Sequence, residues 1–124
     1  MDAYWSRRTH DAIARFEEMA TGPRTSRLNE EVIRAASQGR VEELFVATDA
    51  ELWGTFEPAT GAVKLMPAMG PDADDLLDLA AVMTLASGGN VYPLPMSEMP
   101  GPGPAHPLAA VFRWGQAGLP EKIA

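Results

Sequence analysis

Apolar residues recur along this chain with the spacing of helices in three segments. They return every three or four positions over residues 2–20 and again over residues 28–38, with polar residues between them. Residues 72–87 are apolar almost all round, which is typical of a helix buried on more than one side. The pattern therefore predicts three helices, the first of which ends at the Gly22-Pro23 break.

The second helix carries signals at both ends. Ser26 or Thr25 is placed to cap its start, because such side chains accept hydrogen bonds from the first free backbone N–H groups. Gly39 follows its end, where only glycine enters the left-handed conformation cheaply. The stretch 22–26 before the helix is expected to be a short linker. The apolar face of this helix is expected to comprise Leu28, Val32, Ala35 and Ala36.

Uninterrupted apolar runs predict the strands. Residues 44–47 form a continuous run of β-favouring residues, the pattern of a central strand covered on both faces. Residues 52–56 and 62–66 are expected to pair as a hairpin around a loop that contains Pro and Gly. A further strand over 90–95 carries two prolines, which place its far end at a sheet edge or at an exit from the sheet, and the last strand spans 108–114.

The predicted elements follow the order helix, helix, strand, hairpin, helix, strand, strand. Helices that alternate with apolar strands favour an α/β fold. We expect a three-layer α/β/α sandwich with one mixed sheet and helices on both of its faces. Residues 1–22 are assigned to an N-terminal helix, which could connect to domains outside this chain, and residues 23–124 to a single domain.

The amino-acid composition excludes several kinds of functional site. The chain has 124 residues and no cysteine, which excludes disulfides, a thiolate zinc site and a cysteine nucleophile. Its longest apolar runs fall short of the roughly 18 residues of a membrane span. The sequence MDAYWSRRTHD at its start lacks the apolar segment of a signal peptide. We therefore expect a cytoplasmic protein with no membrane partner.

Charge is unevenly distributed along the chain. The net charge is −7, which argues against nucleic acid as the main partner because phosphate binding uses clustered Lys and Arg. Residues 1–40 hold seven Arg and six acidic residues, whereas residues 41–124 hold three basic and eleven acidic residues. The alternative of RNA or ribosome binding would therefore use the N-terminal arginines. The candidate residues for that alternative are Arg24, Arg27, Asn29, Arg34 and Arg40.

The densest cluster of ionisable groups lies at the start of the third helix. Asp74 and Asp78 are expected to share a helix face, as are Asp75 and Asp78. Carboxylates on one face could bind Mg²⁺ or Ca²⁺, so a metal-dependent hydrolase is a second alternative. Acidic residues in a first helical turn are also favoured by the helix dipole alone.

No motif in the sequence identifies a type of reaction. The two histidines, His10 and His106, are 96 positions apart, and no serine lies in a Gly-x-Ser-x-Gly elbow. The pair Gly88-Gly89 is expected to close the third helix as a cap. We therefore assign no catalytic residue, no cofactor and no metal ligand.

Protein recognition is the function that these features favour. Loops carried by a rigid sheet are where recognition concentrates. Two such regions are the hairpin 51–66 and the loop 96–107, which is rich in Pro and Gly. The candidate partner-binding residues are Trp53, Met96, Glu98, Met99 and His106.

Two sets of residues resemble a known family. The first is the stretch EVIRAASQGRVEELFV, which runs over residues 31–46. The second set is Asp75-Leu76-Leu77-Asp78-Leu79-Ala80, Thr84, Gly88-Gly89, Val91-Tyr92, Leu94-Pro95 and Met99-Pro100. Together they resemble the C-terminal domain of the bacterial archaeo-eukaryotic release factor family, whose members are related to the eukaryotic-type peptide-chain release factor and to Pelota.

The resemblance implies a fold and a role. The family's last domain is similar to the kink-turn-binding ribosomal proteins, in which a helix, a Gly-x-Val turn and a buried strand follow one another in an α/β/α sandwich. Peptide release depends on a Gly-Gly-Gln loop in a different domain, so the resemblance implies no hydrolytic role here. It favours a non-catalytic domain that docks a protein partner in translation or ribosome rescue.

The kink-turn binders also carry a Gly-x-Asn-Glu-x-x-Lys signature at the start of the equivalent helix. In this chain Asn29-Glu30 matches only the middle of that signature. Arg27 takes the place of the glycine and Ile33 that of the lysine. This departure, together with the acidic net charge, favours protein docking over RNA binding.

Overall fold

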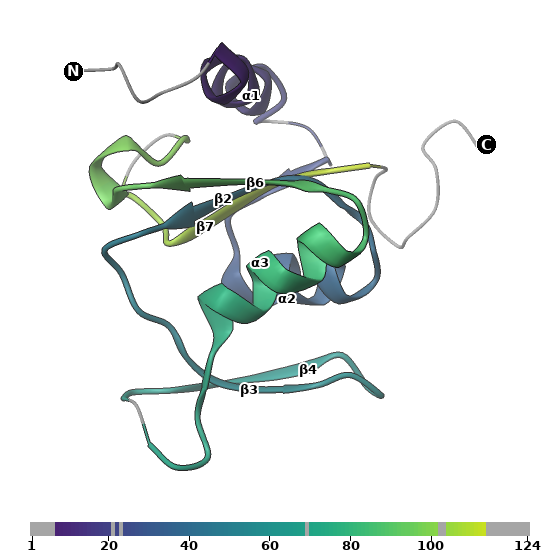
Figure 1. Ribbon diagram of the computed structural model, residues 1–124, viewed down its shortest axis with the longest axis vertical. Helices are drawn as coiled ribbons and strands as arrows, with labels where there is room; N and C mark the ends of the chain where they lie inside the picture. Colours follow the sequence, from purple (N-terminus) through teal and green to yellow (C-terminus); the bar gives the residue numbers. More distant parts are fainter. Residues whose placement is uncertain (1–6, 21, 23, 69, 102–103, 114–124) are drawn as a thin grey trace.

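The computed structural model describes residues 7–20, 22, 24–68, 70–101 and 104–113. Over these residues the protein has a mixed α/β fold with three α-helices and two β-sheets (Figure 1). The coarse prediction of an α/β fold that contains a mixed sheet is confirmed.

The larger sheet has four strands in the order β1, β7, β2, β6. β2 (Val41–Ala47) runs parallel to β6 (Asn90–Leu94) and antiparallel to β7 (Leu108–Phe112). β1 (Thr25–Ser26) pairs with the other side of β7. The strand that carries proline, β6, therefore lies at an edge of this sheet, as its sequence predicts.

Strand β2 is covered on both of its faces. Leu44 and Phe45 are fully buried, and as neighbours in a strand they point to opposite sides of the sheet. Leu44 belongs to one core cluster together with Ile33, and Phe45 belongs to a second cluster together with Phe16. The prediction of a central strand covered on both faces is confirmed.

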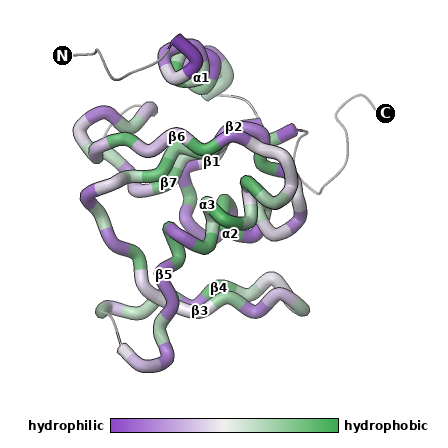
Figure 2. The backbone as a smooth tube through the Cα atoms, viewed as in Figure 1, coloured by the Kyte–Doolittle hydropathy of each residue, from purple (hydrophilic) through white to green (hydrophobic). Residues whose placement is uncertain are grey.

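Helices supply the cover on the two faces of the larger sheet. α1 (Arg7–Glu18) lies on one face, and α2 (Asn29–Ser37) and α3 (Leu76–Ala86) pack against each other on the other face (Figure 1). Phe16 anchors α1 to the larger sheet, because its ring packs edge to face against the ring of Phe45, with the ring centroids 5.9 Å apart. Hydrophobic residues follow α3 and the strands of the larger sheet (Figure 2).

The predicted hairpin is present, but it does not join the larger sheet. β3 (Trp53–Glu57) and β4 (Ala62–Met66) pair antiparallel, and with the short strand β5 (Asp74–Asp75) they form a separate three-stranded sheet. This smaller sheet lies beyond α2 and α3, away from the larger one (Figure 1). The expectation of one sheet was therefore wrong, because Phe56 and Val63 of the hairpin pack against the core that the two helices share.

Local details of the second helix differ from the prediction. The stretch 22–26 contains β1, which is too short to leave a pattern in the sequence. Leu28 holds the N-cap position without a side-chain hydrogen bond, and the Ser26 hydroxyl accepts the Leu28 N–H at 3.1 Å, one step before the helix. Gly39 and Gly88 are confirmed as left-handed residues after α2 and α3, with φ of 73° and 89°.

Some predicted segments extend beyond the described residues. Residues 2–6 of the first predicted helix lie outside them, and so does Trp114 at the end of the last predicted strand. The described parts of both elements are present as α1 and β7.

Gly54 of β3 lies close to both the neighbouring strand β4 and helix α3. A Cβ atom on Gly54 would overlap the Lys64 carbonyl oxygen and lie 2.9 Å from Leu76 Cδ1. We predict that Gly54→Ala lowers the free energy of unfolding by about 1–3 kcal/mol, as overpacking does, measured by chemical denaturation. Gly70→Ala is the matched control, because a Cβ atom there meets nothing within 4 Å. Equal losses in the two variants would contradict the prediction.

Candidate functional site

The five residues predicted to contact a partner lie on two different parts of the fold. Trp53 is half-buried at the start of β3 in the smaller sheet, where its indole N–H donates to the Glu51 carboxylate at 3.3 Å. The other four belong to the connection between β6 and β7 of the larger sheet, which includes the short 3-10 helix η1 (Met96–Glu98). The structure therefore does not bring Trp53 together with the loop residues.

The four loop residues differ in exposure. Glu98 is exposed, and Met96 is half-buried. Met99 is only 9% exposed and packs in the core beneath α1. His106 is half-buried, with Nδ1 3.0 Å from the Arg27 carbonyl oxygen. Glu98 is therefore the most accessible of the four, whereas Met99 is part of the hydrophobic core.

Two arginines of the RNA alternative meet at the end of β7. Arg24 Nε donates to the Phe112 carbonyl oxygen at 3.1 Å, and the Arg40 guanidinium carbon lies 4.9 Å from the centre of the Phe112 ring. Arg40 is only 7% exposed. Little of its guanidinium is therefore accessible to a phosphate.

The other candidates for RNA binding lie around α2. Arg27 donates to the Pro104 carbonyl oxygen at 3.2 Å, and the exposed Arg34 donates to the Gly61 carbonyl oxygen at 3.0 Å. Asn29 is half-buried in the first position of the helix. The structure thus divides the five predicted residues between the end of β7 and the surroundings of α2.

The aspartates do not share a helix face, because α3 begins only at Leu76. Asp74 and Asp75 lie in the extended strand β5, and Asp75 is the N-cap of α3. Its Oδ1 accepts the N–H groups of residues 77 and 78, each at 3.1 Å. Within the described part of the chain, no group of three or more His, Asp or Glu residues could hold a metal ion. The predicted shared face was wrong, and the metal-dependent alternative loses the geometry on which it depended.

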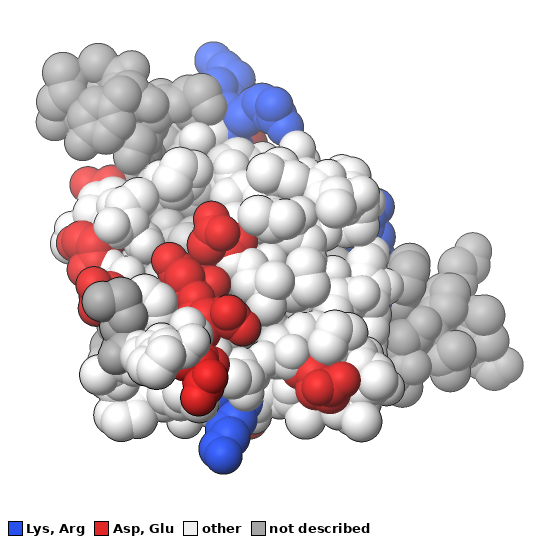
Figure 3. Space-filling model, turned by 60° about the horizontal axis from the view of Figure 1, so that its bottom comes forward, with Lys and Arg blue, Asp and Glu red and all other residues white. Residues whose placement is uncertain are grey.

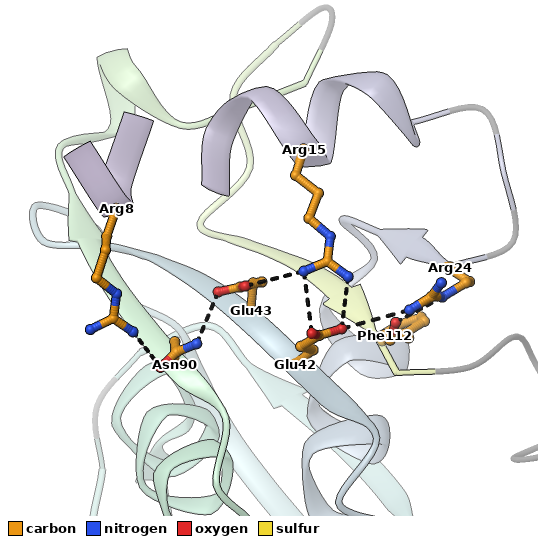
Figure 4. Close-up of polar contacts among 7 residues, drawn as sticks. All are labelled: Arg8, Arg15, Arg24, Glu42, Glu43, Asn90 and Phe112. Carbon is orange, nitrogen blue, oxygen red and sulfur yellow. Dashed lines mark hydrogen bonds and ion pairs between the residues drawn. The ribbon is translucent and has the colours of Figure 1, made fainter. Parts of the chain in front are cut away.

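A polar cluster that sequence reasoning missed joins α1 to the larger sheet (Figure 4). Arg15 of α1 extends toward the start of β2, where its Nη2 lies 2.9 Å from Glu42 Oε1 and its Nη1 lies 3.4 Å from Glu43 Oε2. Arg24 reaches the same Glu42 oxygen at 3.6 Å. The hydrogen bond that Arg15 donates to Glu42 is the main cause that raises the pKa of Arg15, so this guanidinium stays charged.

The cluster continues toward β6 (Figure 4). Arg8 donates to Asn90 Oδ1 at 2.8 Å, and the Asn90 amide donates to Glu43 Oε1 at 3.4 Å. Glu43 is only 8% exposed, so its charge needs these partners. Tyr92 lies in the same region, and burial, followed by a hydrogen bond with Glu43, raises its pKa.

This arrangement ties α1 to the larger sheet. Ion pairs as exposed as Arg15 and Glu42, with 37% and 34% of their side chains accessible, contribute about 0–1 kcal/mol each. Burial of Phe16 contributes more, about 1.5–3 kcal/mol. The cluster therefore sets the position of α1, whereas apolar contact supplies most of its attachment.

An open groove among the described residues lies between the start of α2 and β4. It has a volume of about 540 Å³ and is lined by apolar and charged side chains. Its two apolar members, Leu28 and Leu65, are 64% and 44% exposed. The remaining lining residues are Asn29, Glu30, Glu31 and Arg34. Sequence reasoning missed this groove, since Leu28 was expected on the buried face of its helix.

A second apolar surface lies on the outer side of α3. Val82 and Leu85 are 53% and 60% exposed. Beside Leu85, a groove of about 340 Å³ runs between α1, α3 and β6. α3 is buried on several sides, as predicted, by α2 and by both sheets, but this outer side is open.

Comparison with known proteins adds no further constraint. No family model matches this chain, and no curated protein matches it. None of the helices in the described ranges is long and apolar enough to cross a membrane. A function has to be inferred from the chain's own residues.

The capping role of Asp75 leads to a stability prediction. Asp75→Ala removes the carboxylate that accepts two N–H groups at the start of α3. We expect the free energy of unfolding to fall by about 1 kcal/mol, as measured by chemical denaturation. Asp74→Ala removes the neighbouring exposed carboxylate of β5 and is the control, with little expected change. Similar losses in both variants would argue against the cap.

Tyr92 leads to a prediction at alkaline pH. Because its pKa is raised above the ordinary value of 10.0, the folded protein keeps the phenol proton at a pH where the unfolded chain has lost it. This stabilisation is complete below pH 10 and is lost as the pH rises through the pKa of the folded state. Chemical denaturation from about pH 8 to about pH 11 should show the unfolding free energy of the wild type falling relative to that of Tyr92→Phe. A constant difference between the two would refute the prediction.

Proposed function

We propose that this chain is a non-catalytic interaction domain that docks a protein partner in translation or ribosome rescue. The resemblance to the C-terminal domain of the bacterial archaeo-eukaryotic release factors is the first support. That domain is a three-layer α/β/α sandwich in which a helix, a Gly-x-Val turn and a buried strand succeed one another. Here α2 is followed by Gly39 with φ of 73° and by Val41, which is fully buried at the start of β2.

The observation that carries the proposal is the groove between α2 and β4. Single exposed leucines are common on protein surfaces. Leu28 and Leu65 differ because they lie on the same open groove, where 64% and 44% of their surfaces meet water. Covering two leucines in a concave site is favourable, and such a site is typical of protein recognition.

The charges around the groove indicate which residue types a partner would place there. Glu30 is exposed in the first turn of α2, whereas Glu31 accepts the Ser26 hydroxyl at 2.7 Å. Arg34 is held by the Gly61 carbonyl oxygen. We expect the partner to insert an apolar side chain between the two leucines and to place a basic residue beside Glu30.

RNA is the weaker candidate for the same region. A kink-turn binder needs accessible basic groups, and the contacts at Phe112 occupy Arg24 and Arg40. The net charge of −7 also opposes phosphate binding. A gel shift with structured RNA at low salt tests this alternative. A salt-dependent shift that Arg34→Glu abolishes would favour RNA, and the absence of any shift would end this interpretation.

Leu28→Glu and Leu65→Glu test the docking groove directly. The chain has two lysines, and one of them, Lys64, lies on β4 next to Leu65. An amine-reactive cross-linker added to the chain in an extract of its host cells should therefore join the partner to Lys64. We expect a translation or rescue protein among the products, and a loss of at least about tenfold with either variant.

Ala14→Glu is the matched control for this experiment. Ala14 is exposed on α1, so the variant adds the same charge away from the groove, and the cross-link to Lys64 should persist. A partner captured equally by all three variants would overturn the groove as the docking site. A partner with no part in translation would overturn the proposed context.

A further inference from the structure

We propose that two copies of this chain associate through the outer face of α3. Apart from Asp78 and Thr84, this helix consists of apolar residues, a composition typical of a helix that is covered all round. Yet Val82 and Leu85 leave 53% and 60% of their surfaces exposed. The other sides of α3 are already packed against α2 and the two sheets, so the open side is where a further contact fits.

Exposed residues of α3 form one stripe with an acidic group at its beginning. Asp78, Val82 and Leu85 follow one another at intervals of four and three, so they share a side of the helix. All three are exposed. In space-filling view, acidic side chains gather in a column beside a broad uncharged area (Figure 3). The stripe is therefore negative at the N-terminal end of the helix and apolar in the middle.

A basic group lies just beyond the C-terminal end of the same stripe. Arg8 donates to Asn90 Oδ1 at 2.8 Å, shortly after the last turn of α3. Arg8 also lines the groove of about 340 Å³ together with Leu85. From one end to the other, this surface thus runs from a carboxylate through valine and leucine to a guanidinium group.

This order of charges selects a second copy as the occupant. When two α3 helices pack antiparallel about a two-fold axis, Val82 of each copy meets Leu85 of the other. Asp78 of each copy then comes to the end of the other helix, near Arg8 of that copy. The opposite charges match twice, which is the self-complementarity that a two-fold interface requires. A partner of uniform charge would gain at one end of the helix and lose at the other.

The neighbouring strand edge is poorly suited to join two copies instead. β6 is an edge strand, and its Leu94 carbonyl oxygen turns inward to accept the Thr48 N–H at 2.8 Å. Because backbone groups alternate along a strand, Val91 and Pro93 turn outward. Pro93 has no N–H, so Val91 supplies the only outward donor of this strand. Side-chain contact through α3 is therefore the stronger route.

Sedimentation equilibrium of the full chain tests the proposal. The wild type should show a concentration-dependent equilibrium between monomer and dimer. Leu85→Glu should weaken this association at least about tenfold, because it places two carboxylates at the centre of the contact. Leu65→Glu introduces the same charge at an exposed leucine of β4 and should associate as the wild type does. Circular dichroism of both variants checks that they remain folded.

Engineered cysteines test the antiparallel arrangement. Because the chain has no cysteine, each introduced thiol is the only one in its copy. Val82→Cys mixed with Leu85→Cys should form a disulfide-linked heterodimer under mild oxidation, and Leu65→Cys should stay monomeric.

A charge exchange tests the pairing at the two ends. Asp78→Arg and Arg8→Asp should each weaken the dimer, and the two changes combined should restore it, because they exchange the signs across the axis. A monomer at every concentration would overturn the proposal and leave a different protein as the occupant of α3. So would a dimer that Leu65→Glu disrupts and Leu85→Glu does not. The first result leaves the groove between α2 and β4 open to a protein partner, whereas the second would assign that groove to a second copy of the chain.

Discussion

The rest of this structure depends on one constraint, the burial of β2 on both faces. Leu44 and Phe45 are adjacent, fully buried and directed to opposite sides of the sheet, so the strand needs two separate cores. The pair α2 and α3 supplies one core, and α1 supplies the other. The polar cluster follows from the same constraint. Glu43 lies at the start of β2, at the rim of the core beneath α1, and only 8% of it is exposed. A carboxylate in that position is tolerated because Arg15 and Asn90 reach it from neighbouring elements.

Much of the fold could be predicted because its long elements carry strong periodic patterns. The apolar run of β2, the stripe of α2 and the glycine after it act locally, so the sequence alone reveals them. The placement of the hairpin could not be predicted, because it depends on packing between distant residues. A hairpin with one apolar side can join a sheet or cover a helix, and the absence of a Cβ atom at Gly54 lets it approach Leu76 of α3 closely. Pairing with β3 places Asp74 and Asp75 in the extended strand β5, so α3 begins only at Leu76. The predicted helix face of carboxylates is therefore not formed.

The candidate surfaces were harder to predict than the fold, for a related reason. Composition identifies residues that are able to bind, but tertiary contacts decide which of them remain accessible. Met99 lies in a loop rich in Pro and Gly and is nevertheless part of the core, and Arg40 is covered by its contact with Phe112. The opposite happens at Leu28, which continues the apolar stripe of α2 in sequence. It precedes the first turn of the helix and turns to solvent, 64% exposed. Periodicity predicts which side of an element is apolar, and only the packing shows what covers that side.

The two exposed apolar surfaces are linked through the helices that carry them. α2 and α3 lie between the two sheets, so their inner sides are fully used and their free flanks are rigidly held (Figure 1). The groove at Leu28 and the stripe at Leu85 therefore keep a constant relation to each other. When two copies pair through α3, the two grooves are held at a defined separation, one on each side of the symmetry axis. A partner with two suitable segments then binds the second groove as an intramolecular event, which raises its overall affinity without any new contact. Self-association through one surface would in this way strengthen docking at the other.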